Sequence, residues 1–218
     1  MLAPRFSVVN NIDFAGIEFY SFVCDYFLVW NDFTKNEAVK AGIDESRIKV
    51  LGISKCVGKP RLKCKQDARS VGVFLDGEFE KFNNKPLINI VQDWARKNSM
   101  NCVFRYHPNF EGTEYSDLID NKVSSVCPQN VTLEEFIENN SFFVLANSTV
   151  LFELEYYCVP FIRYSTNDDM DKFRDYPSQS FTNIEELGRA FENMRKLPPK
   201  KFVSCDDAYS EFFREFER

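Results

Sequence analysis

The sequence predicts an α/β protein whose mainly parallel, Rossmann-like sheet is flanked by helices. Two observations support this class. Short apolar runs that suit buried strands alternate along the chain with segments of helical periodicity. In residues 142–164 the order is an apolar run, a polar turn, a helical segment and a second apolar run. That order places the turn residues at the carboxyl edge of a parallel sheet, where such folds bind ligands.

Each predicted strand is a run of mostly apolar residues bounded by turn residues. The strands are expected at residues 6–9, 26–30, 47–52, 70–75, 102–106 and 123–126, with two more inside 142–164. Helices are expected at residues 32–41, 85–97, 115–119, 133–138 and 184–195, with another that opens at Asn147. The helix over 85–97 carries apolar residues at i, i+3, i+4 and i+7. Asn31 and Gly42 bracket the first helix, and Thr132 with Glu135 fits a capping box.

The predicted organisation has three parts. Residues 61–200 are expected to form a Rossmann-like nucleotide-binding domain, with about five strands between residues 70 and 165. Residues 1–60 are a short N-terminal segment with a strand–helix–strand unit, which belongs either to the same sheet or to the remnant of another. Residues 201–218 are a C-terminal tail rich in Phe and charge.

The composition of the chain argues against several classes of function. The chain has 218 residues, of which 44% are hydrophobic and 28% charged, so it can bury a sizeable core. A net charge of -6 and a pI near 5.0 argue against nucleic acid as a partner held by bulk electrostatics. Seven cysteines without a CxxC pair, together with one His, give no clustered zinc site and favour a reducing compartment. No run reaches the roughly 20 apolar residues of a membrane span, so we expect a soluble cytoplasmic protein.

His107 and Pro108 end a predicted strand, so the imidazole is expected at the carboxyl edge of the sheet. A His there can donate a hydrogen bond to a phosphate or to a leaving-group oxygen. Arg105 stands two residues earlier on the same strand and would add positive charge. The alternative is that this single His only caps a strand or packs against Tyr106 and Phe110.

Asn147, Ser148 and Thr149 open a predicted helix. Backbone N–H groups and the positive end of the helix dipole favour a phosphate there, and the two hydroxyls add donors. The alternative is a plain N-cap, which Ser and Thr provide without any ligand. Glu153, one turn further on, either reaches sugar or ribose hydroxyls or is a carboxylate on the helix surface.

Two acidic segments are further candidates. Asp76 and Glu78 flank a glycine just after the first strand of the domain, and their carboxylates would serve as a base or as ligands. Asp-Gly is also a common turn. Asp168, Asp169 and Asp171 have the composition of a metal loop but not its ligand spacing, so we expect a solvated acidic loop.

Taken together, these segments resemble glycosyltransferases of the GT-B type. Residues 26–30 and 42–52 resemble the junction that precedes the C-terminal domain of those enzymes. Residues 104–108 resemble the His-Pro motif of bacterial capsule and lipooligosaccharide transferases, including sialyltransferases and polysialyltransferases. Residues 147–162 resemble their Ser/Thr motif, and the CDP-glycerol polymerases of teichoic-acid synthesis have a similar arrangement. The resemblance covers roughly residues 20–195.

The resemblance implies a GT-B C-terminal domain with the N-terminal domain largely absent. In such families the two motifs hold the nucleotide and phosphate of a donor such as CMP-sialic acid, so His107 would assist the leaving group. The implied nucleotide- and phosphate-binding residues are Arg105, Pro108, Asn147, Ser148, Thr149 and Glu153. The catalytic base of a GT-B enzyme usually comes from the N-terminal domain, and Asp76 is the substitute that this chain offers.

Three hypotheses follow. The first is a glycosyltransferase, or its donor-binding half, in bacterial surface polysaccharide or lipooligosaccharide biosynthesis. It would use a CMP- or UDP-linked sugar and a glycan acceptor, without a cofactor or a metal. The second is a non-catalytic module that docks to a partner transferase through its Phe-rich termini. The third is a sugar-nucleotide epimerase-like enzyme. The expected partners also include a second copy of the chain and a membrane surface for peripheral association.

Overall fold

The computed structural model of the chain describes residues 6–8, 24–62, 64, 69–77, 81–108, 113–165, 171–198 and 202–215. The chain divides into two compact units. Unit 1 comprises residues 1–60 and 202–218, and unit 2 comprises residues 61–201. The C-terminal segment, expected from the sequence to be a separate tail, therefore belongs to the same unit as the N-terminal strands.

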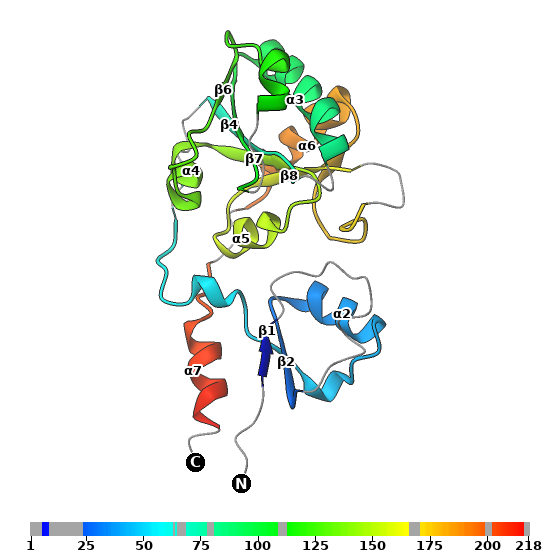
Figure 1. The fold of residues 1–218 in the computed structure, drawn as a ribbon, viewed down its shortest axis with the longest axis vertical. Helices are drawn as coiled ribbons and strands as arrows, with labels where there is room; N and C mark the ends of the chain where they lie inside the picture. The colour runs from blue at the N-terminus through cyan, green and yellow to red at the C-terminus, as the bar shows by residue number, and fades with distance from the viewer. Residues whose placement is uncertain are drawn as a thin grey trace. The chain divides into compact units, whose positions relative to one another are not determined.

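Unit 1 contains a three-stranded parallel sheet in the order β1-β2-β3 (Figure 1). The strands are β1 (Phe6–Val8), β2 (Tyr26–Val29) and β3 (Ile48–Val50). This sheet is separate from the sheet of unit 2, which decides between the two placements that the sequence leaves open. Helix α2 (Asp32–Lys40) covers it. The core of this unit includes Phe27, Val29, Ala38, Ile43 and Ile48.

Helix α2 begins as the sequence predicts. The backbone N–H of Thr34 donates to Asn31 Oδ1 at 2.9 Å, and the backbone N–H of Asn31 donates to Thr34 Oγ1 at 3.0 Å. This reciprocal capping satisfies donors that the first turn of a helix leaves unpaired. The helix ends at Lys40, and Gly42 follows with a φ of 91°. Both predicted boundary signals are therefore confirmed.

The C-terminal segment contains a helix that the sequence analysis does not predict, α7 (Asp206–Arg214). The Phe212 ring meets Tyr26 edge to face, with 5.6 Å between the ring centroids. Phe212 is buried, whereas Phe213 is 41% exposed. One of the Phe residues expected to form a docking surface is thus a core residue of unit 1.

Unit 2 is built on a six-stranded parallel sheet in the order β6-β5-β4-β7-β8-β9 (Figure 1). The strands are β4 (Ser70–Phe74), β5 (Asn101–Arg105), β6 (Ser124–Val126), β7 (Phe142–Leu145), β8 (Phe161–Tyr164) and β9 (Ser180–Phe181). Numbered within the unit, this is the strand order of doubly wound nucleotide-binding folds. The chain runs outward from β4 to β6 and then returns to the other side of β4. The predicted fold class is confirmed.

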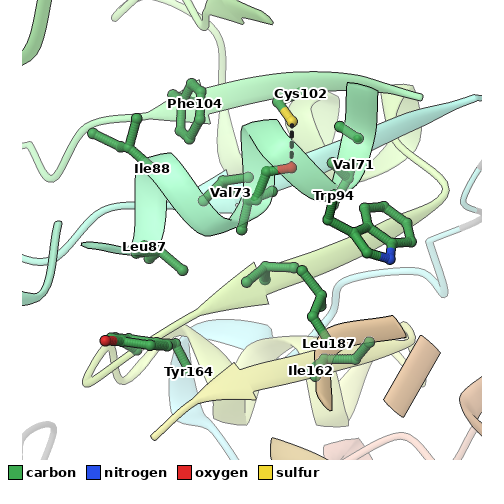
Figure 2. Packing of buried hydrophobic residues seen from close by; sticks show 14 of the residues in the cluster. Val71, Val73, Leu87, Ile88, Trp94, Cys102, Phe104, Ile162, Tyr164 and Leu187 are labelled. Carbon is green, nitrogen blue, oxygen red and sulfur yellow. Dashed lines mark hydrogen bonds between the residues drawn. The ribbon is translucent and has the colours of Figure 1, made fainter. Parts of the chain in front are cut away.

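Helices cover both faces of the six-stranded sheet. They are α3 (Asn84–Asn98), α4 (Leu133–Asn139), α5 (Val150–Tyr156) and α6 (Ile184–Lys196). Helices α3 and α6 share one face, where the core includes Val71, Trp94 and Leu187 (Figure 2). On the other face, Phe74 lies against Phe136 of α4, with 5.1 Å between the ring centroids. Adjacent strand residues therefore bury their side chains in opposite layers, as a two-sided parallel sheet requires.

Gly72 leaves room for two aromatic rings on the face of β4 that α4 covers. A Cβ atom at this position would lie 2.5 Å from the ring of Phe143 and 3.0 Å from the ring of Phe136. Real Cβ atoms do not approach other atoms this closely, so the two rings pack against the strand only because residue 72 has no side chain.

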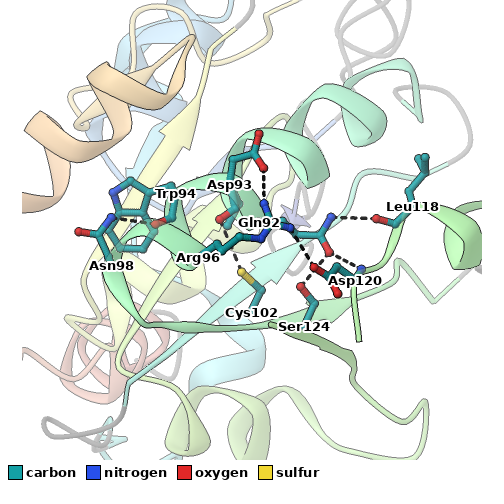
Figure 3. Close-up of polar contacts among 10 residues, drawn as sticks. Gln92, Asp93, Trp94, Arg96, Asn98, Cys102, Leu118, Asp120 and Ser124 are labelled. Carbon is teal, nitrogen blue, oxygen red and sulfur yellow. Dashed lines mark hydrogen bonds and ion pairs between the residues drawn. The ribbon is translucent and has the colours of Figure 1, made fainter. Parts of the chain in front are cut away.

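A polar network joins α3 to the outer part of the sheet (Figure 3). The Gln92 amide N–H donates to the Leu118 carbonyl at 2.8 Å. Gln92 Oε1 accepts from the Asp120 N–H at 2.7 Å and from the Ser124 hydroxyl at 2.8 Å. These bonds satisfy an amide that would be costly to bury without partners. Nearby, Cys102 is a fully buried core residue, and burial raises the pKa of its thiol to about 12.

Two predicted elements of unit 2 need adjustment, and a third element was not predicted. The helix expected at 115–119 is the 3-10 helix η4 (Thr113–Leu118), and the helix expected from Asn147 begins at Val150. Strand β9 has two residues, too few for a sequence pattern. The other predicted elements agree to within about two residues at each end, which is the usual uncertainty of a boundary. Within the described ranges, none of the helices combines the length and the apolar character that a bilayer crossing needs.

Candidate functional site

Three parallel strands bring the predicted site residues to one edge of unit 2. Asp76 follows β4, His107 follows β5 and Asn147 follows β7. Strand β4 lies between the other two, so the three loops are neighbours. The chain changes direction across the sheet between β4 and β7. Sheets of this kind bind ligands at such a switch point, outside the carboxyl ends of the strands.

Asp76 connects the loops on the two sides of the switch point. Its carboxylate is 3% exposed. The backbone N–H of Asn147 donates to Asp76 Oδ1 at 3.1 Å and to Oδ2 at 3.3 Å. The Asn83 side-chain amide donates to Oδ2 at 3.0 Å. Both carboxylate oxygens therefore accept hydrogen bonds, and one of these bonds fixes the start of the loop after β7.

Asn84 fixes the backbone on which Asp76 stands. The Asp76 N–H donates to Asn84 Oδ1 at 2.8 Å, and the Asn84 amide donates to the Asp76 carbonyl at 3.0 Å. Asn84 is fully buried at the start of α3, and its amide also lies 3.5 Å from the Tyr115 hydroxyl. Sequence reasoning missed Asn83 and Asn84. The available signal was a pair of Asn residues, strong acceptors and donors, next to an Asp-Gly loop.

His107 packs against the same loop. A Cβ atom placed on Gly77 would lie 3.3 Å from the imidazole Cγ and 3.4 Å from Nδ1, so the glycine backbone lies directly against the ring. His107 is half-buried and Pro108 is exposed. The loops after β4 and β5 thus meet at the imidazole. This contact agrees with the prediction that both loops lie at the same edge of the sheet.

The loop after β7 presents hydrogen-bond donors. Within the described residues, the backbone N–H groups of Ser148 and Thr149 and the hydroxyl of Thr149 have no hydrogen-bond partner. The Ser148 hydroxyl accepts from the Val150 N–H at 3.4 Å. Thr149 precedes α5 without capping it through its side chain, so the plain N-cap alternative does not describe Thr149. Both residues are half-buried.

Glu153 and Arg105 lie in different surroundings. Glu153 of α5 is 3% exposed, so it is not the surface carboxylate of the alternative interpretation. Arg105 Nη1 donates to the Val131 carbonyl at 2.8 Å, and its guanidinium lies 5.5 Å from the Phe136 ring centroid. None of the contacts described for Arg105 involves His107 or the loop after β7.

A buried ion pair follows the next strand, β8. Arg163 is 2% exposed, and its Nη1 lies 2.5 Å from Asp171 Oδ1. The Ser165 hydroxyl donates to Asp171 Oδ2 at 2.6 Å, and the Phe173 N–H donates to Oδ1 at 3.0 Å. The predicted solvated loop is therefore wrong for Asp171, because the charge of Arg163 and two further donors hold it inside the protein. An Arg within an apolar strand was the available signal, since such a charge needs a partner.

Three of the predicted residues, Glu78, Asp168 and Asp169, lie outside the described residues. Among the residues that are described, no group of three or more His, Cys, Asp or Glu side chains is arranged to hold a metal ion.

No protein-family model matches the sequence, and no curated protein matches it. Solved structures do share its fold. UDP-GlcNAc 2-epimerase from Methanocaldococcus jannaschii, in complex with UDP-GlcNAc and UDP, matches 88% of the chain at 18% identity with a TM-score of 0.56. UDP-N-acetylglucosamine 2-epimerase from Rickettsia bellii matches 93% at 14% identity with a TM-score of 0.57. The glycotransferase of kitacinnamycin matches 89% at 13% identity with a TM-score of 0.54.

These similarities define the class of fold. The chain has the α/β fold with a parallel sheet flanked by helices that GT-B-type structures share. It spans 61%, 62% and 55% of the lengths of the three solved proteins, so it corresponds to somewhat more than half of each.

Proposed function

We propose that unit 2 binds a nucleotide sugar at the switch point between β4 and β7, as the donor-binding part of a GT-B glycosyltransferase. The observation that carries the proposal is the convergence of three loops there. His107 lies against Gly77 on one side, and the unpartnered N–H groups of Ser148 and Thr149 lie on the other. Neighbouring N–H donors at a switch point suit a phosphate. A solved structure of similar fold that contains UDP supports the ligand class.

The proposed chemistry is transfer of the sugar from the nucleotide to a glycan acceptor. The acceptor oxygen bonds to the anomeric carbon, the bond from that carbon to the phosphate oxygen breaks, and the acceptor proton passes to a base. The departing phosphate gains charge, which the donors of Ser148 and Thr149 and the imidazole of His107 stabilise. Removal of one such preorganised donor typically lowers kcat by about 10² to 10³. In this scheme Glu153 lies near the hydroxyl groups of the ribose or of the transferred sugar.

We assign Asp76 a positioning role in this scheme. Its two oxygens already accept from the Asn147 N–H and from the Asn83 amide. Through Asn147 it sets the course of the loop that carries Ser148 and Thr149. The alternative role predicted from the sequence, that of a substitute base, requires the same carboxylate to take a proton from the acceptor, and the two roles are separable by an Asp76→Asn substitution.

The finer identity of the reaction rests on the sequence resemblance. The His-Pro and Ser/Thr segments resemble those of bacterial capsule and lipooligosaccharide transferases, so we propose a CMP- or UDP-linked donor and a role in surface polysaccharide biosynthesis. Pro108 would fix the backbone after His107, because proline restricts φ.

Calorimetric titration of the purified chain with CMP, CDP, UDP and GDP tests the proposal. We expect saturable binding of one of these nucleotides, with affinity lowered at least about tenfold by His107→Ala and by Thr149→Val, as expected for hydrogen bonds to a charged group. Ser125→Ala is the matched control, since Ser125 is exposed on β6. Binding of no nucleotide would overturn the proposal and favour a module that docks to a partner transferase.

A second candidate is a sugar-nucleotide epimerase-like enzyme, favoured by the fold shared with two UDP-GlcNAc 2-epimerases. Incubation with UDP-GlcNAc alone separates the two. An epimerase converts the free nucleotide sugar without an acceptor, whereas a transferase leaves the sugar configuration unchanged. Nuclear magnetic resonance of the anomeric proton reports either result directly.

A further inference from the structure

A cavity of about 1500 Å³ lies in unit 2 at the edge of the sheet opposite the candidate site. Its lining includes residues that stand just before strands or at their first position, namely Arg69, Met100, Ser141, Phe161 and Gln179. Because all six strands are parallel, these residues mark the amino edge of the sheet. Asp76, His107 and Thr149, by contrast, follow the carboxyl ends of their strands. The cavity is therefore not part of the proposed donor site.

The body of this cavity is apolar. Much of its lining consists of aliphatic and aromatic side chains, including those of Leu62, Phe142, Val159, Phe191, Met194 and Leu197. Leu197, the residue that follows α6, is 58% exposed. Ligand pockets in proteins usually measure about 300–1,000 Å³, so the cavity has room for an extended apolar chain.

Three arginines belong to the lining of the cavity. Arg61 and Arg69 line the cavity with exposed side chains, and neither side chain has a hydrogen bond or an ion pair with the described residues. Arg195 also lines the cavity and is only loosely paired, with Nη1 3.9 Å from Glu192. Glu155 is the one carboxylate of the described lining, and it accepts a hydrogen bond from the Tyr176 hydroxyl. Three arginines and one carboxylate in the described lining give this cavity a positive balance in a chain whose net charge is -6.

We propose that this cavity binds an amphipathic phosphate, that is, a long alkyl or isoprenoid chain that ends in a phosphate monoester. The apolar chain fills the cavity, and the phosphate binds to Arg61 and Arg69. Guanidinium donors pair with phosphate oxygens in a bidentate manner, and a phosphate monoester, with up to two charges and three terminal oxygens, can accept from two guanidinium groups at once, whereas a carboxylate has one charge and two oxygens. The inference does not depend on nucleotide binding at the opposite edge.

Trp94 is a built-in reporter for this site. Its ring lies 5.7 Å from Phe142 and 4.9 Å from Phe191, centroid to centroid, and both of those rings line the cavity. Trp94 itself is 3% exposed in the core (Figure 2). The chain has two Trp residues, so Trp30→Phe leaves Trp94 as the single tryptophan, which is excited selectively over the tyrosines at long wavelength.

The test is a fluorescence titration of the Trp30→Phe chain with decyl phosphate below its micelle concentration, beside inorganic phosphate and decanol. We expect a saturable change in Trp94 emission with decyl phosphate, a weaker one with decanol and none with phosphate alone. The double substitution Arg61→Gln and Arg69→Gln is expected to reduce the affinity for decyl phosphate at least about tenfold and to leave that for decanol unchanged. The matched control, Arg189→Gln with Arg214→Gln, removes the same charge from outside the lining.

Three results would overturn the proposal. They are the absence of a saturable response to decyl phosphate, an equal response to inorganic phosphate, and an affinity that falls as much in the control variant as in the Arg61 and Arg69 variant. Nucleotide binding measured on the same proteins should be unchanged in every case, which separates failure of this inference from failure of the proposed donor site.

Discussion

Two buried aspartates in unit 2 follow parallel strands of the same sheet, and the contacts described for their carboxylates differ. Asp171, after β8, is held by the guanidinium of Arg163 at 2.5 Å. The carboxylate of Asp76, after β4, accepts hydrogen bonds from the neutral donors of Asn147 and Asn83. Removal of the cation from a buried ion pair destabilises a fold strongly, because the charge of the carboxylate stays buried without compensation. The hydrogen bonds that Asp76 accepts from Asn147 and Asn83 set the geometry of the switch point.

The difference predicts that stability and ligand binding respond separately at the two places. Substitutions at the Arg163 pair should lower the free energy of unfolding with little specific effect on nucleotide affinity. Substitutions around Asp76 should change nucleotide affinity by more than their effect on stability would suggest.

The largest expected effect is that of Arg163→Met. This change leaves the carboxylate of Asp171 buried without its cation, which typically lowers the free energy of unfolding by about 3–5 kcal/mol. Urea denaturation measures it. The double substitution Arg163→Met with Asp171→Leu should recover much of the loss, because it removes the buried charge as well. A loss below about 1 kcal/mol in the single variant would mean that Asp171 behaves as the solvated residue predicted from the sequence.

Asp76→Ala is expected to have the next largest effect. It leaves the Asn147 N–H and the Asn83 amide buried without an acceptor, at a cost of about 1–3 kcal/mol for each donor that stays unsatisfied. Nucleotide affinity should fall as well, because the loop that carries Ser148 loses its anchor.

Asp76→Asn sharpens the same prediction. Its amide oxygen still accepts one hydrogen bond, but the side chain no longer takes up a proton at neutral pH. If Asp76 positions the loop, this variant keeps most of the nucleotide affinity and measurable sugar transfer. If Asp76 is the base predicted from the sequence, the variant binds nucleotide normally and loses transfer. Calorimetry and a transfer assay on one protein preparation distinguish the two.

Local signals in the sequence were enough to predict much of the fold. The cap at Asn31 and the apolar spacing in residues 85–97 depend on nearest neighbours along the chain, and both elements are confirmed. The meeting of the loops after β4, β5 and β7 was also predictable, because parallel strands end at a common edge.

The sequence does not show which side chains meet when distant parts of the chain pack together. Asp171 belongs to an acidic stretch that has a solvated composition, and only its position against Arg163 makes it a core residue. Arg105 was expected to add charge near a phosphate, but its contacts are with Val131 and the ring of Phe136. Helix α7 lies in a Phe-rich segment, and its sequence pattern does not show whether the Phe residues pack inside the protein or dock to a partner. The contact between Phe212 and Tyr26 shows that Phe212 packs inside unit 1.

The smallest expected effect on stability, and the most specific for the site, is that of Gly77→Ala. The added methyl group would lie 3.3 Å from the His107 ring, so the imidazole has to move by a few tenths of an ångström. Gly77 lies outside any helix or strand, and we expect a change of at most about 1 kcal/mol in the free energy of unfolding. Nucleotide affinity should nevertheless fall severalfold, because a hydrogen bond from His107 to a phosphate depends on the position of the ring.

Gly188→Ala is the matched control for this last prediction. Gly188 lies in α6, where an added Cβ atom would meet only Trp94 Nε1 at 3.7 Å, an ordinary contact distance. Alanine in a helix interior is favoured over glycine by about 1 kcal/mol, so this variant should be slightly more stable and should bind nucleotide as the parent chain does. If both glycine variants bind nucleotide equally well, His107 does not contact the bound phosphate. Loss of affinity in Gly77→Ala alone would place the ligand against the ring that this glycine supports.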